Sequence, residues 1–354
     1  MESIWAFGAI SDPVLRLALW CCAGALLLSS LLLLAIVGLR LHLLRNQRRE
    51  QRFVLRWRPI LLECLLAMQL PAAAPSLAAN EQYFFLRLWL RLLETVRGDN
   101  KQILLQLARN VGCVEFSMRM LDGANRGRQL LAIMALGHLR ERAAWEHLRQ
   151  LAHAPDAGRS FAAMRALIQI APGHAAEMAE LPLLRDDWPL ARVTALLQPV
   201  SAAFSPALLA ALRQQNDLNK VEKSLRLLEL LHITPGRAEL LPWLAARSPA
   251  HLQVRALRVA RHPQFLPRIR ALCQHQDWRV RVQAAHALGA TGGEQDLALL
   301  ATMLSDAQWW VRYRAAYALL EHPAGGMPLA ARLQEELSDR YAVDILKQAI
   351  AEHV

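Results

Sequence analysis

The sequence predicts an all-α fold, an α-solenoid of about seven to eight helical repeats behind an N-terminal transmembrane helix. A helical motif recurs along the chain, turn-forming residues return about every 30 positions, and an uncharged apolar run lies near the N-terminus. The β-branched alternation and hairpin turns that mark strands are nearly absent.

The clearest repeat motif occupies residues 277–289. Asp277 is a good helix N-cap, because its carboxylate can accept the unpaired amide hydrogens of the first turn. Val280, Ala284 and Leu288 then recur every four residues and form one apolar stripe, and Gly289 begins a glycine-rich stop. One such helix pair cannot bury its apolar face alone, so the repeats are expected to stack.

Similar segments at 132–137, 191–197 and 311–319 are offset from this motif by close to multiples of about 30 residues. The turn signals of successive repeats lie 29 to 33 residues apart. They are Asn125, Asp156, Asp187, Asp217, Ser248, Asp277, Asp306 and Asp339.

The motif resembles the HEAT-repeat family, in particular its subtype with the pattern Asp-x-x-Val-Arg-x-x-Ala-Ala-x-Ala-Leu-Gly, as in bilin-lyase-like HEAT repeats. The resemblance covers roughly residues 123–354 and is specific for architecture, not for function. The residues that match the pattern are Asp277, Val280, Arg281, Ala284, Ala285, Ala287, Leu288 and Gly289.

In that family, turn aspartates and second-helix arginines form a ladder between neighbouring repeats, and the second helices line the concave face. The resemblance therefore implies ladder roles for Asp277 and Arg281, with Arg312 and Arg192 in equivalent positions. Asp306 departs from the pattern, because it lies five residues before Val311 instead of three.

Residues 17–39 are uncharged and almost wholly apolar. As a helix they would reach about 35 Å, enough to cross the hydrocarbon core of a bilayer. A cleaved signal peptide is the alternative, but Glu2 and Asp12 precede the first basic residue, Arg16, so the positive region that begins such peptides is missing. We expect an uncleaved anchor.

Seven arginines and one glutamate follow the apolar run within residues 40–58. By the positive-inside rule this side faces the cytoplasm and the N-terminal tail faces out. We therefore expect a single-pass protein of a bacterial-type inner (cytoplasmic) membrane with a cytoplasmic repeat domain. The arginines expected to contact anionic headgroups are Arg45, Arg48, Arg49, Arg52, Arg56 and Arg58.

The predicted organisation is a short extracytoplasmic tail (1–13), a transmembrane helix (14–39), a basic juxtamembrane segment (40–58), a helical cap of the solenoid (59–122) and the HEAT-repeat array (123–354). The formal net charge of the chain is +11, much of it in the juxtamembrane segment. Because the remaining positive charge is thinly spread, and the anchor restricts access, nucleic-acid binding is disfavoured.

The sequence contains no recognisable catalytic constellation. The five cysteines include no Cys-x-x-Cys, and the most metal-like histidine pair, His147 and His153, falls on opposite faces of a helix. Phosphate-binding loops and nucleophile elbows are absent. We therefore predict no catalytic residue, metal or cofactor. The alternatives are a lyase or hydroxylase on a HEAT scaffold, and a nucleic-acid-binding HEAT-like protein.

The last repeats contain the residue types that dominate binding energy at protein interfaces, namely Trp, Tyr and Arg. A shift of 31 residues places Arg279 beside Trp310, where stacking would add about 1 kcal/mol. In the alternative, Trp278, Trp309 and Trp310 pack between repeats as core. The predicted partner-binding surface comprises Arg279, Gln283, His286, Trp310, Arg314 and Tyr317.

We therefore expect a membrane-tethered cytoplasmic scaffold that binds a protein partner, such as a component of an inner-membrane or envelope assembly. A repeat array supports this function class because it gains binding surface by adding repeats and needs no catalytic pocket.

Overall fold

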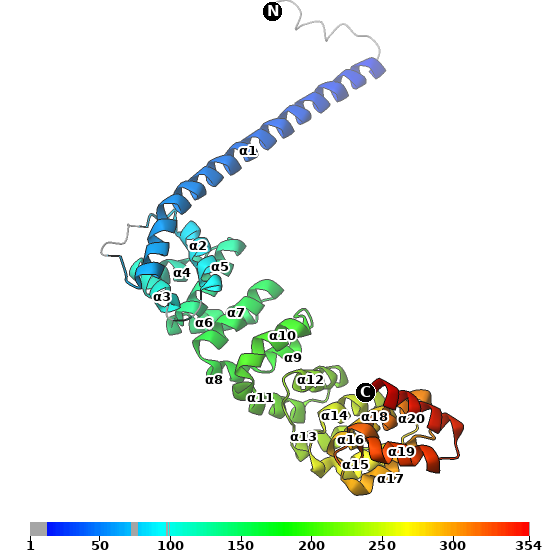
Figure 1. The fold of residues 1–354 in the computed structure, drawn as a ribbon. Coiled ribbons are helices and arrows are strands. Elements are labelled where there is room, and N and C mark those ends of the chain that lie inside the picture. Colours follow the sequence, from blue (N-terminus) through cyan, green and yellow to red (C-terminus); the bar gives the residue numbers. More distant parts are fainter. Residues whose placement is uncertain (1–12, 72–76, 97, 99, 354) are drawn as a thin grey trace, which may run out of the picture. The chain divides into compact units, whose positions relative to one another are not determined.

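The computed structural model describes residues 13–71, 77–96, 98 and 100–353, and all regular secondary structure in these residues is helical (Figure 1). The predicted all-α fold is confirmed. The chain divides into two compact units, Met1–Ala135 and Leu136–Val354. The predicted extracytoplasmic tail lies outside the described residues, except for Pro13.

The first unit is built on one long helix. The predicted membrane span, the basic segment and the start of the predicted cap all lie in this 55-residue helix, which continues through Pro59. The helices of this unit are α1 (Pro13–Ala67), α2 (Gln82–Thr95), α3 (Asn100–Asn110), α4 (Cys113–Leu121) and most of α5 (Arg126–Leu139).

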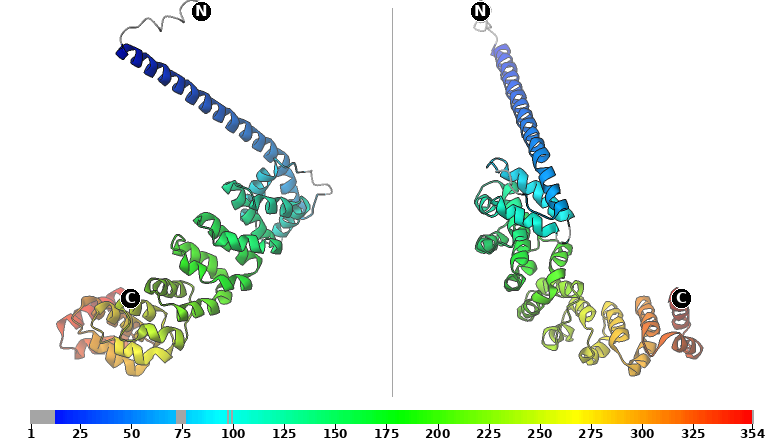
Figure 2. Two further views of the ribbon diagram at one scale, coloured as in Figure 1. Left: turned by 180° about the vertical axis from the view of Figure 1, so that it is seen from behind. Right: turned by 60° about the vertical axis from the view of Figure 1, so that its left-hand side comes forward.

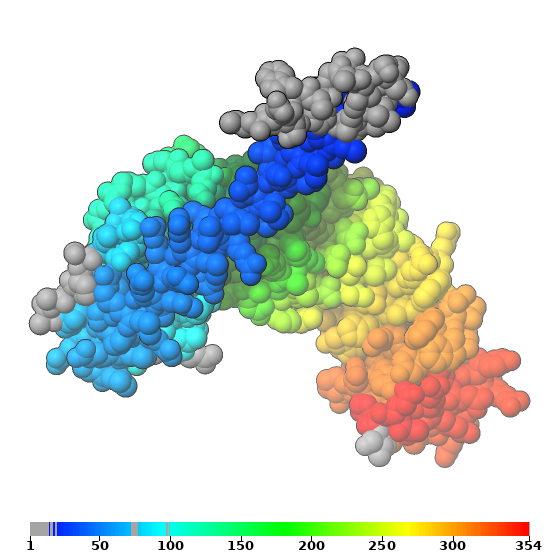
Figure 3. Space-filling model, turned by 90° about the horizontal axis from the view of Figure 1, so that it is seen from above, coloured from blue at the N-terminus to red at the C-terminus, as the bar shows by residue number. Residues whose placement is uncertain are grey.

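The last third of α1 belongs to the core of the first unit. Phe53 and Trp57 lie on one face of α1 and are buried. Their rings contact Phe84 and Phe85 of α2, with ring centroids 6.0 and 5.1 Å apart. The indole of Trp89, also on α2, donates to the Leu104 carbonyl at 2.8 Å. Figure 3 shows this part of α1 in blue, joined to the cyan residues of the same unit.

The second unit begins at the end of α5 and continues as helix pairs (Figures 1 and 2). Its helices are η2 (Arg142–Ala144), α6 (Trp145–Ala152), α7 (Ala157–Ile170), α8 (Pro172–Ala175), η3 (Ala176–Met178), α9 (Leu181–Leu184), α10 (Leu190–Leu197), η4 (Gln198–Val200), α11 (Ser201–Gln214), α12 (Leu218–Leu230), α13 (Arg237–Leu244), α14 (Ala250–Val259), η5 (Pro263–Phe265), α15 (Leu266–Leu272), α16 (Trp278–Thr291), η6 (Glu294–Asp296), α17 (Leu297–Met303), α18 (Trp309–Glu321), α19 (Gly326–Glu336) and α20 (Arg340–His353).

The second helices of successive pairs pack side by side within this unit. Helix α12 contacts α14, α14 contacts α16, α16 contacts α18, and α18 contacts α20. Each of these helices also contacts the first helix of its own pair, so every repeat is held by its neighbours, as in an α-solenoid.

All the predicted turn aspartates except Asp187, which pairs with Arg185, accept backbone amides at the start of second helices. The carboxylates of Asp156, Asp217 and Asp277 accept hydrogen bonds of 2.8 to 3.0 Å from backbone amides of α7, α12 and α16. Asp306 and Asp339 accept from the amides of residues 308 and 341 in the same way, at 2.8 and 2.9 Å. The interval of about 30 residues is therefore a repeat of helix N-caps.

Small residues bring neighbouring second helices close together. The apolar stripe of α16 is buried as predicted, with Ala284 and Ala285 fully inside. A Cβ atom added to Gly289 would lie only 2.6 Å from the Ala318 Cβ of α18, and one added to Gly137 would lie 2.8 Å from Ala166 of α7. The recurrence of glycine at these equivalent positions thus reflects close contact between helices.

Among the described residues, two helical stretches are long and apolar enough to cross a membrane, Trp20–Ala67 and Leu190–Gln214. Along the first, the large apolar side chains described between Leu17 and Leu44 are all exposed. The second runs from α10 to α11 and buries Val193, Phe204 and Leu208 in the repeat array. Only the first therefore presents a continuous apolar surface.

Candidate functional site

Arg281 connects two neighbouring repeats. Its guanidinium donates to both carboxylate oxygens of Asp306, at 2.7 and 2.8 Å, and to the backbone carbonyls of His275 and Gln276. Burial by itself would raise the pKa of Asp306, but the hydrogen bonds from Arg281 and the Gln308 amide hold it below its usual value. Asp306 is therefore the carboxylate partner of Arg281 despite its irregular spacing.

The other predicted ladder residues have different contacts. Asp277 caps α16 through the Arg279 amide. Arg312 donates to the Asp306 carbonyl at 2.8 Å and lies over the Tyr341 ring at 5.6 Å. Arg312 therefore bonds a backbone carbonyl of its own repeat, and its contact with the next repeat is the Tyr341 ring of α20.

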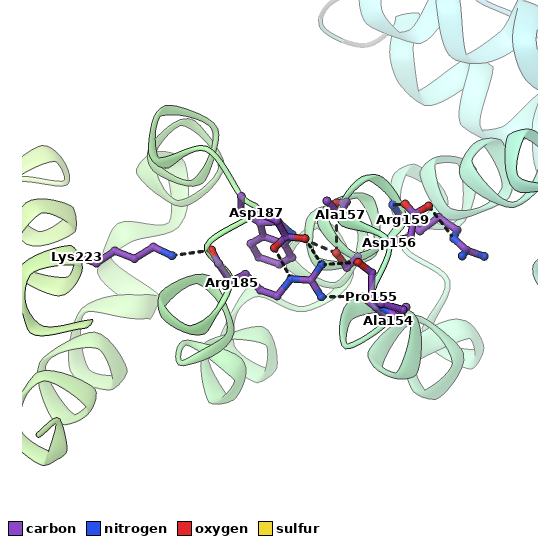
Figure 4. A network of polar contacts seen from close by, with 10 residues as sticks. Ala154, Pro155, Asp156, Ala157, Arg159, Arg185, Asp187 and Lys223 are labelled. Carbon is purple, nitrogen blue, oxygen red and sulfur yellow. Dashed lines mark hydrogen bonds and ion pairs between the residues drawn. The ribbon is translucent and has the colours of Figure 1, made fainter. Parts of the chain in front are cut away.

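In the repeat of α9 and α10, the hydrogen bonds between repeats come from Arg185 and not from Arg192 (Figure 4). Arg185 forms a two-point ion pair with Asp187 and donates to the carbonyl of Ala154, 31 residues earlier, at 2.6 Å. Lys223 of α12 in turn donates to the Arg185 carbonyl at 2.6 Å. Arg192 instead lies over the Phe161 ring at 5.7 Å.

The six residues of the predicted partner-binding surface lie on two helices packed side by side, α16 and α18. Arg279, His286 and Trp310 are exposed. Gln283, Arg314 and Tyr317 are half-buried. We call these six residues the α16–α18 surface.

The tryptophans of α18 lie on the surface. Trp310 is 55% exposed and Trp309 is 39% exposed, which contradicts the alternative in which both fill the core. Trp278 is half-buried. Arg279, expected beside Trp310, places its guanidinium 5.5 Å from the Trp278 ring centroid.

Four aromatic side chains of α18, namely Trp309, Trp310, Tyr313 and Tyr317, form one cluster. Trp309 stacks on Tyr313 with ring centroids 4.9 Å apart, and Tyr313 lies 4.8 Å from Tyr317. Trp310 meets Trp309 edge to face at 4.7 Å. Tyr313 is not among the residues predicted from the sequence, although the i, i+4 spacing of Trp309, Tyr313 and Tyr317 could have identified it.

Glu352 of α20 completes the cluster. Its carboxylate oxygen accepts hydrogen bonds from Tyr313 at 2.8 Å and from Tyr317 at 2.7 Å. The hydrogen bond to Glu352 raises the pKa of Tyr317, and the same bonds lower the pKa of Glu352. No sequence signal identifies Glu352, because its partners lie 35 and 39 residues away.

The α16–α18 surface contains cationic groups, and the Glu352 carboxylate lies against its Tyr317 ring. Partial burial of the His286 imidazole and the charge of Arg314 both lower the pKa of this histidine. Arg279 and Arg314 then supply the cationic groups. Exposed aromatic and arginine side chains on one surface are typical of binding hot spots.

The basic segment of α1 is exposed on the helix surface. All six arginines predicted to contact the membrane are exposed. Arg56 is nevertheless paired with Glu81 at 2.6 Å, and Glu50 is paired with Arg87 of α2 at 3.1 Å. The basic segment is therefore attached to the first unit by ion pairs at its C-terminal end.

The described residues contain no group of three or more metal-binding side chains. Two buried cysteine thiols, one in each unit, are also poorly suited to nucleophilic chemistry. Burial raises the pKa of Cys113 and of Cys273 to about 12, so both stay protonated at neutral pH.

Comparison with known proteins identifies the repeat type. Among solved structures, YibA of E. coli aligns at 14% identity over 78% of this chain and 99% of its own, with a TM-score of 0.31. An engineered protein aligns at 16% identity over 75% of this chain and 77% of its own, with a TM-score of 0.32. Alignments with sequence identity and TM-score this low say nothing about function. No curated protein matches the chain. The family model of HEAT repeats matches residues 237–320, so this part of the all-α array, from α13 into α18, consists of HEAT repeats.

Proposed function

We propose that this chain is a membrane-tethered scaffold whose repeat array binds a protein partner through the α16–α18 surface. The observation that supports it most directly is the exposure of Trp309 and Trp310 on a second helix of the array. Large aromatic side chains gain binding energy only when a partner covers them, and packed repeats normally bury such residues.

The array is also suited to present such a surface rigidly. The side chains of Tyr313 and Tyr317 are fixed by hydrogen bonds to Glu352 of the next second helix. Because these rings are already ordered, they would lose less side-chain entropy when a partner binds. A component of an inner-membrane or envelope assembly is the class of partner that fits a tethered scaffold.

The proposed tether is the N-terminal part of α1. Its described large apolar side chains are exposed as far along the helix as Leu44. The arginines that begin at Arg45 follow directly. This order of apolar and basic residues supports a single span with the repeats on the cytoplasmic side.

In intact spheroplasts, external protease should leave the repeat array uncut. Digestion that requires no lysis would contradict this orientation.

The partner proposal is tested with the full-length protein, captured in mild detergent from its native membrane. A double variant, Arg279→Ala with Trp310→Ala, removes one cation and one exposed aromatic ring from the α16–α18 surface. The matched control, Met327→Ala with Arg332→Ala, removes an apolar and a cationic side chain from α19, both also exposed. Mass spectrometry identifies the proteins that are captured with each variant.

We expect a stoichiometric membrane protein with the wild type and the control, and its loss with the double variant. A hot-spot loss of about 2 kcal/mol or more weakens binding roughly 30-fold. Circular dichroism should be unchanged, because both substituted side chains are exposed. Equal capture by the double variant and the control would refute this surface as the binding site.

A further inference from the structure

A groove elsewhere in the second unit is separate from the α16–α18 surface. It lies between α7 and α10, is open to solvent, and has a volume of about 700 Å³. Its walls are mainly apolar and include Phe161 and Ile168 of α7, Leu196 of α10, and Pro199 and Val200 of η4.

Three guanidinium groups line this apolar groove. Arg165 and Arg192 come from α7 and α10, and Arg140 follows the end of α5. All three are exposed, and Arg192 is held over the Phe161 ring at 5.7 Å. None of the three forms an ion pair with a carboxylate of the described residues.

Other arginines on second helices of the array are paired with carboxylates. Further along the second helices, Arg255 and Arg258 of α14 pair with Glu222 and Glu229 of α12, each at 3.3 Å. The same kind of side chain on the same kind of helix thus finds a carboxylate there. The groove between α7 and α10 has positive charge that the array itself leaves unbalanced.

We infer that this groove binds an acidic peptide segment of a protein partner. An apolar side chain of the peptide would lie between α7 and α10, and its carboxylates would meet Arg140, Arg165 and Arg192. Guanidinium groups bind carboxylates through two parallel hydrogen bonds, which gives both affinity and orientation. This inference does not depend on the α16–α18 surface.

A peptide fits the groove better than a lipid does. The three arginines come from two helices and the turn after α5, so they offer several positions for carboxylates, as a run of acidic residues requires. The groove is open, so an extended chain can enter it along its length. An acyl chain would remain partly in contact with water there and would lose much of its transfer free energy.

The test begins with a selection from a library of random twelve-residue displayed peptides on the full-length protein in nanodiscs. We expect enriched peptides to combine Asp or Glu with Leu, Ile or Phe. One enriched peptide is then labelled with fluorescein, and its Kd is measured by fluorescence anisotropy. The same peptide with Gln and Asn in place of Glu and Asp is the ligand control.

Two protein variants separate charge from shape. Arg165→Gln with Arg192→Gln removes two cations, whereas Ala195→Glu keeps all three arginines and adds a carboxylate at an exposed position of the groove. Each should raise the Kd of the acidic peptide about tenfold or more. The matched control, Arg268→Gln with Arg332→Gln, changes two exposed arginines of α15 and α19 and should leave the Kd unchanged.

Three results would overturn the inference. The selection could yield no acidic and apolar consensus. The Kd could stay unchanged in both groove variants while circular dichroism shows normal folding. Anionic lipid vesicles, and no peptide, could bind in a manner that depends on Arg165 and Arg192, which would assign the groove to lipid instead.

Discussion

Replacing Gly289 by alanine is predicted to destabilise the second unit, although alanine is normally the better helix former. Gly289 lies on α16, and the new Cβ would be 2.6 Å from the Ala318 Cβ, 3.0 Å from its Cα and 3.2 Å from its carbonyl oxygen. Carbon atoms in contact normally lie about 3.5–4.0 Å apart. Two of the three atoms it would meet are backbone atoms of α18, so no side-chain rotation can relieve the contact.

The magnitude follows from two opposing effects. Alanine in place of glycine stabilises a helix interior by roughly 0.5–1 kcal/mol. Overpacking a close contact costs about 1–3 kcal/mol, because α16 and α18 must move apart along their whole contact. We expect the second effect to exceed the first by about 1 kcal/mol, which lowers the Tm of a unit of this size by about 2–4 °C.

Thermal unfolding followed by circular dichroism of the full-length protein in detergent measures this effect. Gly173→Ala is the matched control, because a Cβ at Gly173 of α8 would meet no atom within 4 Å. It should leave the Tm equal or slightly raised. Ala318→Gly in the Gly289→Ala background removes the nearest contact and should restore part of the lost stability.

A Tm for Gly289→Ala that equals or exceeds that of Gly173→Ala would show that α16 and α18 can separate without cost. The close helix contact would then not explain why glycine occupies this position. Loss of stability without any recovery in the double variant would instead place the strain elsewhere.

Three further predictions concern other contacts. Ala284→Leu should overpack the buried stripe of α16 and cost about 1–3 kcal/mol, which unchanged urea unfolding would disprove. Trp57→Ala should cost about 3–5 kcal/mol in the first unit and make residues 77–135 sensitive to protease, whereas full resistance would mean that α1 is not part of that core. Hydrogen bonds from Arg270 hold the pKa of Asp296 in the folded protein below its ordinary value of 3.8. The pair therefore stabilises the fold above about pH 4, and this stabilisation is lost as the pH falls through the folded-state pKa of Asp296. Asp296→Asn should therefore cost about 1–3 kcal/mol at pH 7 and reduce the acid dependence of urea unfolding; an identical acid dependence in both proteins would refute this role.

The sequence by itself determined the features that are local or periodic. The turn aspartates can be recognised because a cap is formed within three residues, and Asp156, Asp217 and Asp277 all cap helices in the structure. The buried stripe at Ala284 and Leu288 follows from helical spacing alone. The repeat architecture follows because each unit shows the same local pattern.

Only the tertiary structure decided which distant residues meet. The irregular spacing of Asp306 gave no indication that it would pair with Arg281, because the path of the turn, and not the count of residues, sets their distance. Glu352 joins Tyr313 and Tyr317 across two helices. The exposure of Trp310 and the groove between α7 and α10 depend on how closely neighbouring helices pack, which many weak contacts decide together.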